Sequence, residues 1–496
     1  MKMTKSKLEE AEEKLLKQCS KYFEGKDLDA VRDALEFTKS AHVNQKRESG
    51  EPYAIHPIYT ALRLAEINLD KDAIVAALLH DTLEDTDVKP IAIKRRFGPV
   101  ALSLIESVTK LGKVRIRKSW FPFYQAKKVD MSEFERQVET LRKMLIAVAK
   151  DTRVIFIKLS DKIYNLETLE YLEESKRERI AKEAIEIYAP IAGRLGINEW
   201  KDLLEDLAFP YVYPDEYVKL KKLAIPEIKI REKYLKVLSK KVVSMLEEND
   251  IKHEIMFRAK KWYSLYKKLK KHDGDISKIY DLVALRIVVD TLEDCYVVMG
   301  LIHSRWKPLS GRIKDYVAMP KPNGYQSLHT TVSCDDGEIV EFQIRNKQMH
   351  RQAEYGIASH WIYDDDKRSR SASKHDIEWL NEFTKYQREI ESSHDLAASL
   401  HLDFFQDRIF VFTPKGDAKD LPINSTPVDF AYSVHTDIGN HCNGAKINGK
   451  IASLNSKLQN GDMVEIIVSK SAKPRRDWLE FVVTEMARSH IRRNIK

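Results

Sequence analysis

From Met1 to about Trp200, apolar residues recur at the three- and four-residue spacing of amphipathic helices. Asp72–Leu79 and Leu141–Ala149 show this spacing clearly. Lys113–Val129 is basic and aromatic, interrupts the spacing and is predicted to be a loop between helices. Leu203–Asp250 is again helical and highly charged, as expected for a connector. The pattern therefore predicts an all-α N-terminal domain.

The pattern changes near Ile251, where short apolar runs replace the helical spacing. Leu282–Val289 is rich in β-branched residues, and Thr330–Ser333 and Ile339–Ile344 are predicted to be strands on either side of an Asp-Gly turn. Asp294–Trp306 has the spacing of a helix. Strands mixed with helices predict an α/β or α+β domain.

The C-terminal part begins with a polar segment of low complexity, Asp364–Lys374, which is typical of linkers, and a helical stretch to about His401. Arg408–Phe412 and Met463–Val468 then predict a small β-rich module, and Trp478–Lys496 is basic and predicted to be helical. The expected order is an all-α domain (1–200), a helical connector (201–250), an α/β domain (251–365), a linker with a helix (366–403), a β-rich module (404–470) and the start of a further helical region (471–496).

Composition adds little to this picture, although it narrows the class of protein. The 496 residues suit about three domains. Neither an apolar run long enough to span a membrane nor the apolar core of a signal peptide is present, so we expect a cytoplasmic protein. The net charge of +8 comes from mixed signs and permits a polyanionic substrate. The four cysteines show no CxxC spacing, so we expect reduced structural thiols.

The strongest chemical motif follows the apolar stretch that ends at Leu79. His80 and Glu84, like Asp81 and Asp85, are one helical turn apart, so all four side chains can face one site. An imidazole beside a carboxylate suits a divalent transition metal such as manganese, iron or zinc. The further carboxylates can orient or deprotonate a water molecule bound to that metal.

Two distant residues can complete such a metal cage. His56 lies in a turn-rich segment, and Asp161 follows the apolar stretch Val154–Ile157. The alternative is a polar helix terminus with solvated carboxylates, and spacing alone does not decide between the two, because single His and Asp residues are commonly structural.

Longer segments of this region resemble the HD-type hydrolase domain of the Rel/SpoT family. The segments are HVNQKRESGEPYAIHP, AALLHDTLEDT, RRFGPVALSLIESVTKLGK and APIAGRLGI. The resemblance implies metal ligands, usually for manganese, at His56, His80, Asp81 and Asp161. It implies a water-activating pair and substrate neighbours at Glu84, Asp85, Arg47 and Asn165. The implied reaction removes the 3′-pyrophosphate of (p)ppGpp and leaves GDP or GTP.

The sequence departs from the family at a few positions of this domain. KLSDKIYN stands where the family usually has KLADRLHN, so Lys162 and Tyr164 replace an arginine and a histidine. Gly193 stands where histidine is frequent, and the loop between Lys113 and Arg142 is longer than usual. None of these positions is an implied metal ligand.

A second group of candidate residues lies between positions 257 and 363 and is dense in cations. Alternating basic residues on strands and turns would line one face and cradle a polyphosphate. Tyr325 in a Pro- and Gly-rich loop could stack on a base, and Asp281 and Glu341 could share a magnesium ion. The alternative is a solvated basic surface, which composition alone favours because no P-loop or GxGxxG occurs.

Three long segments resemble the (p)ppGpp synthetase domain of the same family, which has an α/β, nucleotidyltransferase-like fold. They are IYDLVALRIVV, GRIKDYVAMPKPNGYQSLHTTV and EFQIRNKQMHRQAEYGIASHW. The implied reaction transfers pyrophosphate from ATP to the 3′-hydroxyl of GDP or GTP. The ATP-phosphate side corresponds to Arg258, Lys260 and Ser264, and further phosphate contacts to Arg286, Arg312 and Lys314. Magnesium binding corresponds to Asp281 and Glu341, and Glu341 also activates the 3′-hydroxyl. The guanosine nucleotide corresponds to Tyr325, which stacks on guanine, and to Lys321, Asn323 and His329.

Two details of these segments bear on activity. Arg312-Ile313-Lys314-Asp315 is the basic form of a motif that, in this family, accompanies enzymes that also hydrolyse. Phe257-Arg258-Ala259-Lys260 stands where the family commonly has GRPK, so a glycine and a proline are missing and the two cations remain.

Asp407–Ser469 resembles a TGS domain, a small β-grasp module, through DRIFVFTPKGD, STPVDFAYSVHTDIGNHC and LQNGDMVEI. In long family members this module senses deacylated tRNA on the ribosome, and His435 stands where the acceptor end is read. The alternative for His435 is a surface histidine. Ser489–Arg493 resembles the opening of the helical domain that follows in long members.

The sequence therefore predicts a bifunctional enzyme with a manganese site for hydrolysis and a magnesium site for synthesis. The alternatives are a chain with one active site, or a non-catalytic sensor that binds tRNA or the ribosome. Opposed activities would cycle wastefully, so we expect the two domains to be antagonistically coupled, with the connector from about Trp200 to Asp250 as the relay.

Overall fold

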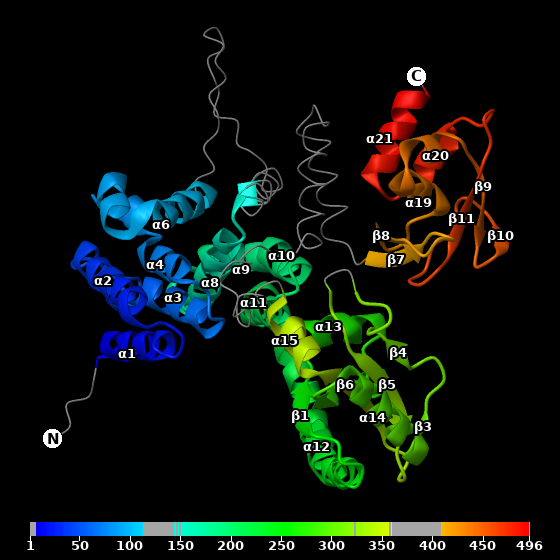
Figure 1. Ribbon diagram of the computed structural model, residues 1–496, viewed down its shortest axis with the longest axis horizontal. Helices are drawn as coiled ribbons and strands as arrows, with labels where there is room; N and C mark the ends of the chain where they lie inside the picture. The colour runs from blue at the N-terminus through cyan, green and yellow to red at the C-terminus, as the bar shows by residue number, and fades with distance from the viewer. Residues whose placement is uncertain are drawn as a thin grey trace. The chain divides into compact units, whose positions relative to one another are not determined.

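The computed structural model describes residues 6–112, 143–144, 147, 150–321, 324–356, 359 and 408–495. The chain divides into two compact units (Figure 1). The first comprises Met1–Val129 and Glu139–Asn381, and the second comprises Asp130–Val138 and Glu382–Lys496. Among the described residues, no helix combines the length and apolar character needed to cross a membrane.

The described N-terminal part of the first unit is entirely helical, as predicted. Its elements are α1 (Lys7–Cys19), α2 (Gly25–Ala41), α3 (Ile55–Glu66), α4 (Lys71–Leu79), α5 (Thr82–Asp85), α6 (Pro90–Gly112), α8 (Arg153–Glu167), η1 (Leu169–Tyr171), α9 (Glu174–Glu183), the π-helical turn η2 (Ala184–Tyr188), α10 (Ala189–Arg194), α11 (Asn198–Val212) and α12 (Pro214–Glu247). The predicted connector is therefore two helices, α11 and the long α12.

Helix α4 is the centre of this helical domain and confirms the prediction for Asp72–Leu79. The Asp70 side chain caps it by accepting a hydrogen bond from the Ala73 amide at 3.0 Å. Every residue from Ala73 to Leu79 is buried. A helix that is apolar on all sides must be enclosed, and α2, α3, α6 and α8 surround it. The polar residues that follow Leu79 are thereby delivered into the interior of the domain.

Two predicted segments lie wholly outside the described residues: the loop at Lys113–Val129, and the linker and helix between Asp364 and His401. The helix predicted at Leu141–Ala149 is described only at 143, 144 and 147, and these residues are helical.

The α/β part of the first unit is built on a mixed sheet. Its elements are β1 (His253–Ala259), α13 (Trp262–Lys271), η3 (Ile276–Lys278), β2 (Val283–Val289), α14 (Leu292–Arg305), β3 (Lys307–Pro308), β4 (Lys314–Asp315), β5 (Leu328–Ser333), β6 (Ile339–Asn346) and α15 (Lys347–Tyr355). The strand order is β1-β2-β6-β5-β3, and β4 pairs with β5. Only β2 and β6 are parallel in this sheet. The predictions of strands at 282–289, 330–333 and 339–344 are confirmed.

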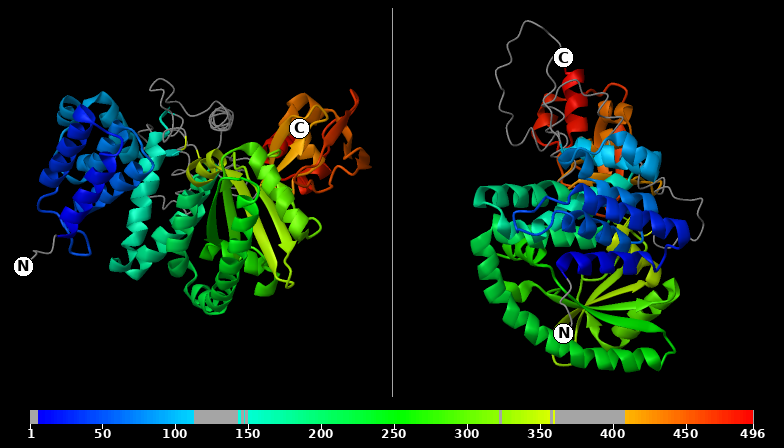
Figure 2. Two further views of the ribbon diagram at one scale, coloured as in Figure 1. Left: turned by 60° about the horizontal axis from the view of Figure 1, so that its bottom comes forward. Right: turned by 90° about the vertical axis from the view of Figure 1, so that its left-hand side faces the viewer.

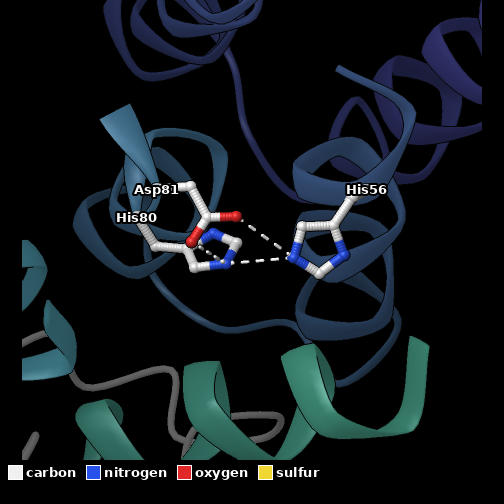
Figure 3. A group of neighbouring side chains, drawn as sticks. All are labelled: His56, His80 and Asp81. Atoms are coloured by element: carbon white, nitrogen blue, oxygen red, sulfur yellow. Dashed lines mark hydrogen bonds and ion pairs between the residues drawn. The ribbon is translucent and has the colours of Figure 1, made fainter. Parts of the chain in front are cut away.

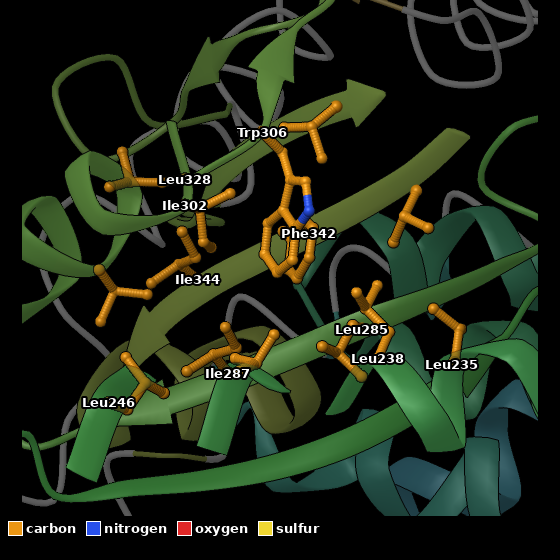
Figure 4. Packing of buried hydrophobic residues seen from close by; sticks show 14 of the residues in the cluster. Leu235, Leu238, Leu246, Leu285, Ile287, Ile302, Trp306, Leu328, Phe342 and Ile344 are labelled. Carbon is orange, nitrogen blue, oxygen red and sulfur yellow. The ribbon is translucent and has the colours of Figure 1, made fainter. Parts of the chain in front are cut away.

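One face of this sheet is apolar and is covered by α12 and α14 (Figure 4). Leu285 and Ile287 of β2 and Phe342 and Ile344 of β6 alternate onto this face and are fully buried. Trp306 stacks on Phe342 with ring centroids 5.9 Å apart. Helix α12 contains Pro226 and bends as it passes along the sheet (Figure 2).

The opposite face of the sheet collects the polar residues, because side chains alternate along each strand. Arg286 of β2 pairs with Gln343 of β6, and Arg345 follows two residues later on the same face. His329 of β5 lies opposite the same Gln343 and opposite Lys314 of β4. The register therefore gathers basic residues from four strands on one face.

The described part of the second unit, residues 408–495, contains two small sheets and three short α-helices. Its described elements are β7 (Arg408–Phe412), β8 (Ala418–Pro422), α19 (Pro427–Val434), α20 (Thr436–Asn440), β9 (Cys442–Ile447), β10 (Lys450–Ala452), β11 (Val464–Val468), η5 (Arg476–Glu480) and α21 (Glu485–Asn494). Antiparallel β10-β9-β11 forms one sheet and β7-β8 the other. A parallel bridge between Phe412 and Met463 links them. The predicted strands at 408–412 and 463–468 are confirmed.

The prediction of one helix over Trp478–Lys496 is wrong in its first part. Residues 476–480 form a 3₁₀ turn, and α21 begins only at Glu485. Tertiary packing explains the break, because Trp478 and Val482 are buried together in the core of this unit. The buried Asp429 carboxylate also accepts hydrogen bonds from the Val483 and Thr484 amides, which holds this segment out of helical geometry.

We expect Phe342→Ala to destabilise the sheet domain by about 3–5 kcal/mol, because it opens a cavity beside Trp306 in a fully packed core. Hydrogen exchange of the β2 and β6 amides measures the loss. Val237→Ala on α12 is the control, since this side chain is 62% exposed and its truncation should change stability by less than about 0.5 kcal/mol. Equal exchange rates in the two variants would contradict the assigned core.

Candidate active sites

Three predicted metal ligands meet at the end of α4 (Figure 3). His56 is the second residue of α3, and His80 and Asp81 directly follow α4. The Nε2 atoms of the two histidines are 3.2 Å apart. Asp81 Oδ2 lies 3.4 Å from His56 Nε2, and Asp81 Oδ1 lies 3.1 Å from His80 Nε2. Two imidazoles and a carboxylate converge on one point, as a divalent metal ion requires.

The histidine environments favour metal binding through Nε2. His80 Nδ1 is 2.8 Å from the Ala77 carbonyl oxygen and donates to it, which leaves the Nε2 lone pair directed at the site. Burial lowers the pKa of His80 and keeps the imidazole neutral. Burial also opposes charge on His56, but the hydrogen bonds to Asp161 and Asp81 outweigh it and raise its pKa. A cation between the rings would satisfy two nitrogen atoms that otherwise face each other.

Asp161, in the middle of α8, reaches the same centre through His56. Its Oδ1 lies 3.4 Å from His56 Nε2 and accepts a hydrogen bond from Asn165 Nδ2 at 2.6 Å. Its Oδ2 accepts one from Lys158 Nζ at 2.8 Å. Burial alone would raise the pKa of Asp161, but Lys158 and His56 hold it well below its usual value. Sequence reasoning missed Lys158, although its position one helical turn before Asp161 was a usable signal.

Tyr53 joins the metal centre to the acidic pair. Its hydroxyl lies 2.8 Å from Asp81 Oδ2 and 2.8 Å from Asp85 Oδ2. A phenol has one proton to donate, so Tyr53 serves one carboxylate at a time and keeps Asp85 beside Asp81. Glu84 lies in the same short helix, and its side chain is exposed. Sequence reasoning missed Tyr53, although it lies three residues before His56.

Arg47 and Asn165, predicted to lie near the substrate, contact each other. Arg47 Nη2 donates to Asn165 Oδ1 at 2.9 Å. The Arg47 guanidinium is 5.3 Å from the ring of Tyr164, which is buried and lies 5.2 Å from the ring of His56. Tyr164, one of the residues that depart from the family, therefore lies between Arg47 and the metal centre. Lys162, the other departure, contacts Glu183 at 3.7 Å.

Asp281 anchors the donor side of the second site. Its Oδ2 accepts a hydrogen bond from Lys260 Nζ at 2.6 Å, and its Oδ1 one from Lys268 Nζ at 2.6 Å. Burial would raise the pKa of Asp281, but the two ammonium groups lower it to about 2. Sequence reasoning missed Lys268, which lies one turn of α13 after Ser264.

Glu341 anchors the acceptor side, on β6. His329 Nδ1 lies 3.2 Å from Glu341 Oε1, and Gln343 Nε2 donates to the same oxygen at 3.1 Å. Burial opposes the charge, but the His329 contact outweighs it and lowers the pKa of Glu341. His329 Nε2 is in turn 2.9 Å from the Tyr325 hydroxyl. A continuous polar chain therefore links the carboxylate to Tyr325.

The remaining predicted cations surround these two anchors. Lys321 Nζ lies over the rings of Tyr316 and Tyr325, at 4.7 and 4.9 Å. Desolvation of its ammonium group and the nearby cations lower the pKa of Lys321 to about 8. Arg312 lies over the Tyr280 ring at 5.6 Å. Asn323 lies outside the described residues.

His435 occupies the turn between α19 and α20 in the second unit. Its side chain is exposed, and its Nδ1 accepts a hydrogen bond from the Asp437 amide at 3.1 Å. This bond caps α20 and fixes the ring in an exposed position.

Comparison with known proteins covers all three regions. The chain matches an HD domain over residues 34–198, a region found in RelA / SpoT proteins over 257–368 and a TGS domain over 409–468. Over 490 residues it is 45% identical to the guanosine-3′,5′-bis(diphosphate) 3′-pyrophosphohydrolase of Aquifex aeolicus, covering 99% of this chain and 67% of that protein. The chain belongs to the RelA/SpoT family. As in other HD hydrolase domains, its HD domain implies a divalent metal ion.

Two further RelA/SpoT relatives carry the complementary names. The chain is 44% identical over 477 residues to the GTP pyrophosphokinase of Myxococcus xanthus, covering 96% of this chain and 62% of that protein. It is 40% identical over 476 residues to the bifunctional (p)ppGpp synthase/hydrolase RelA of Mycobacterium tuberculosis, covering 94% of this chain and 62% of that protein. The chain thus spans about two thirds of the length of these RelA/SpoT relatives.

We expect the HD centre to bind one divalent metal ion and His80→Ala to weaken that binding more than ~10-fold, because even loss of an outer-shell partner typically costs this much. Titration calorimetry with Mn²⁺ measures the affinity. The control is His303→Ala, a histidine that bonds Thr330 on the sheet domain. Unchanged binding in His80→Ala would remove this residue from the ligand set.

Proposed function

We propose that this chain both makes and hydrolyses (p)ppGpp. It transfers pyrophosphate from ATP to the 3′-hydroxyl of GDP or GTP on the sheet domain, and it hydrolyses (p)ppGpp to GDP or GTP and pyrophosphate in the HD domain. The observation that carries this proposal is the presence, in one chain, of a convergent His-His-Asp centre and of a cationic face holding Asp281 and Glu341. Relatives named for each activity support it.

In the proposed hydrolase, His56, His80, Asp81 and Asp161 would hold Mn²⁺, which would supply the charge that makes a water molecule acidic and offsets the charge of the pyrophosphate. Asp85 and Glu84 accept the proton of the attacking water. Tyr53 keeps Asp85 within reach of the centre through its 2.8 Å contacts. Arg47 and Asn165 orient the guanosine nucleotide over the ring of Tyr164. Attack on the 3′-pyrophosphate breaks its bond to the ribose oxygen.

In the proposed synthetase, Asp281 and Glu341 would hold Mg²⁺, which would supply positive charge to the ATP phosphates. Lys260 and Lys268, which both pair with Asp281, are placed to bind those phosphates with Arg258 and Ser264. The ribose 3′-oxygen forms a bond to the β-phosphorus, its proton passes to Glu341, and AMP leaves as the α–β bridge breaks. Tyr325 stacks on guanine. Positioning and charge neutralisation are the main sources of rate in such transfers.

A reciprocal pair of variants tests the proposal in the full chain. We expect Asp81→Ala to abolish Mn²⁺-dependent release of pyrophosphate from ppGpp and to retain ATP-dependent synthesis, because it removes a metal ligand of one site only. We expect Glu341→Gln to retain hydrolysis and to lower synthesis by ~10²- to 10⁴-fold, because it removes the base. Nucleotide chromatography measures both reactions, and each variant is the folding control for the other.

The alternatives give different outcomes in the same assay. Wild-type protein that performs only one reaction would make the other site a relic. Wild-type protein that performs neither, and still binds tRNA, would be a non-catalytic sensor.

The TGS domain is proposed to bind deacylated tRNA through His435. The exposed ring is fixed at the start of α20 by the Asp437 amide, as a reader of a nucleic-acid end would need. We expect His435→Ala to weaken binding of fluorescently labelled deacylated tRNA by at least ~5-fold, since one stacking contact is typically worth 1–3 kcal/mol. His441→Ala at the other end of α20 is the matched control. Equal affinities of the two variants would contradict a specific role for His435.

A further inference from the structure

A buried charge cluster lies on the polar face of the sheet, and only one of its three members, Arg286, was among the predicted phosphate contacts. Arg286 on β2 and Arg345 on β6 share this face. Arg286 Nη1 donates to Glu354 Oε1 at 2.7 Å, and Arg345 Nη1 lies 3.6 Å from the same oxygen. The side chains of Arg286 and Arg345 are only 7% and 0% exposed. One carboxylate of α15 therefore serves two adjacent, buried guanidinium groups.

Glu354 supplies the negative charge that allows Arg286 and Arg345 to lie side by side. Burial, together with Arg345, lowers the pKa of Arg286 to about 10, which still leaves it cationic at neutral pH. Burial opposes the charge of Glu354, but the two arginines outweigh it and lower the pKa of Glu354. Two like charges out of water repel strongly unless a counter-charge lies between them. Glu354 is that counter-charge, so its loss would drive Arg286 and Arg345 apart.

The two arginines reach different halves of the synthetase site. Arg345 Nη2 donates to the Tyr325 hydroxyl at 3.3 Å, and its guanidinium is 5.4 Å from the Tyr325 ring. Arg258, on the donor side, lies opposite Ala284 in the pairing of β1 with β2, two residues from Arg286 and on the same face of the sheet. This nearby cation lowers the pKa of Arg286 further. Arg286 Nη2 and the Nε atoms of both arginines have no hydrogen-bond acceptor among the described residues. Glu354 is therefore the counter-charge that both guanidinium groups share, and it fixes the position of each.

Helix α15, which carries Glu354, is docked against the HD domain. Asn198, the first residue of α11, donates from Nδ2 to the Ala353 carbonyl oxygen at 2.9 Å. Gly356 has φ of +55°, and a side chain there would collide with the Leu195 carbonyl oxygen and with Gly196. The corner between α10 and α11, Leu195–Asn198, therefore holds the C-terminal end of α15 in contact. The place of Glu354 depends on this corner.

We propose that Glu354 is a positioning residue for (p)ppGpp synthesis. Glu354 holds Arg286, next to the ATP-binding side, and Arg345, which contacts Tyr325 on the guanosine-binding side, in fixed positions. One charge cluster therefore positions binding groups for both nucleotides. The HD corner Leu195–Asn198 sets the position of this cluster, and synthesis therefore depends on a contact with the hydrolase domain. This inference rests on the synthetase activity proposed above.

Glu354→Gln and Glu354→Asp in the full chain test the role of the charge. We expect Glu354→Gln to lower kcat/KM for synthesis by ~10- to 100-fold, with higher KM for both ATP and GDP, because misplaced binding groups cost this much. Glu354→Asp, which keeps the charge, should recover part of the loss. Hydrolysis of ppGpp and the thermal unfolding temperature should stay at the wild-type values. The control is Asp290→Asn, which removes an exposed ion pair with Lys347 at the start of α15 and should leave both reactions unchanged.

The outcomes separate this inference from the function on which it rests. Wild-type protein without synthesis would overturn the proposed function. Wild-type synthesis with unchanged KM values and kcat in Glu354→Gln would overturn the positioning role alone. Equal losses in Glu354→Gln and Glu354→Asp, or a parallel loss of hydrolysis and of thermal stability, would reduce Glu354 to a residue needed for folding and would also overturn it.

The part played by the HD corner has its own test. Asn198→Ala removes the hydrogen bond to Ala353 and leaves both active sites untouched. We expect KM for ATP and GDP to rise together by ~3- to 10-fold, in line with the loss of one hydrogen bond, while hydrolysis is unchanged. Synthesis kinetics equal to wild type would show that α15 holds Glu354 without help from the HD domain.

Discussion

The parallel pairing of β2 with β6 is the constraint on which the synthetase domain depends. Leu285 faces Phe342 and Arg286 faces Gln343 in this register, so one alignment of two strands fixes both the core and the substrate face. A slip of one residue would turn the arginines toward α12 and α14 and the apolar residues toward the nucleotides. Packing and catalysis are therefore specified by the same hydrogen bonds, and selection for a stable core also preserves the site.

In the HD domain, helix packing in place of strand register links the apolar core to the polar site. An element that is apolar on every side, α4, has to be enclosed, and its enclosure brings the His80-Asp81 pair beside His56 of α3 and Asp161 of α8. The polar cluster is costly to bury, and each member has a partner that limits the cost: Ala77 for His80, Lys158 and Asn165 for Asp161, and Tyr53 for Asp81 and Asp85. These partners come from three separate segments of the chain, so the metal centre depends on the packing of the whole helical domain.

Sequence reasoning succeeds where the signal is local and fails where it depends on contacts between distant segments. The strand at 282–289 and the apolar helix before His80 can each be predicted from a stretch of fewer than ten residues, and both predictions are confirmed. Arg345 and Glu354 carry no local signal, because their importance comes from partners on other elements. Lys158 and Tyr53 were missed although each lies three residues before a predicted ligand, Asp161 and His56. Trp478 shows the reverse error: a helical, basic composition predicted a helix, but burial of this side chain against the module's core interrupts it. Family resemblance supplied the roles of the predicted site residues, including Arg286, but it did not point to Arg345 or Glu354, which complete the charge cluster.

The double ion pair of Asp281 has a consequence for the order in which the synthetase site is filled. Lys260 and Lys268 each neutralise one carboxylate oxygen of Asp281. A free cation would have to displace one of these ammonium groups, which would then have no carboxylate partner in its place. In the proposed synthesis reaction, the phosphates of ATP would compete with Asp281 for the two lysines and so free the carboxylate. The expected order of filling is therefore that a magnesium ion enters together with its nucleotide and not before it.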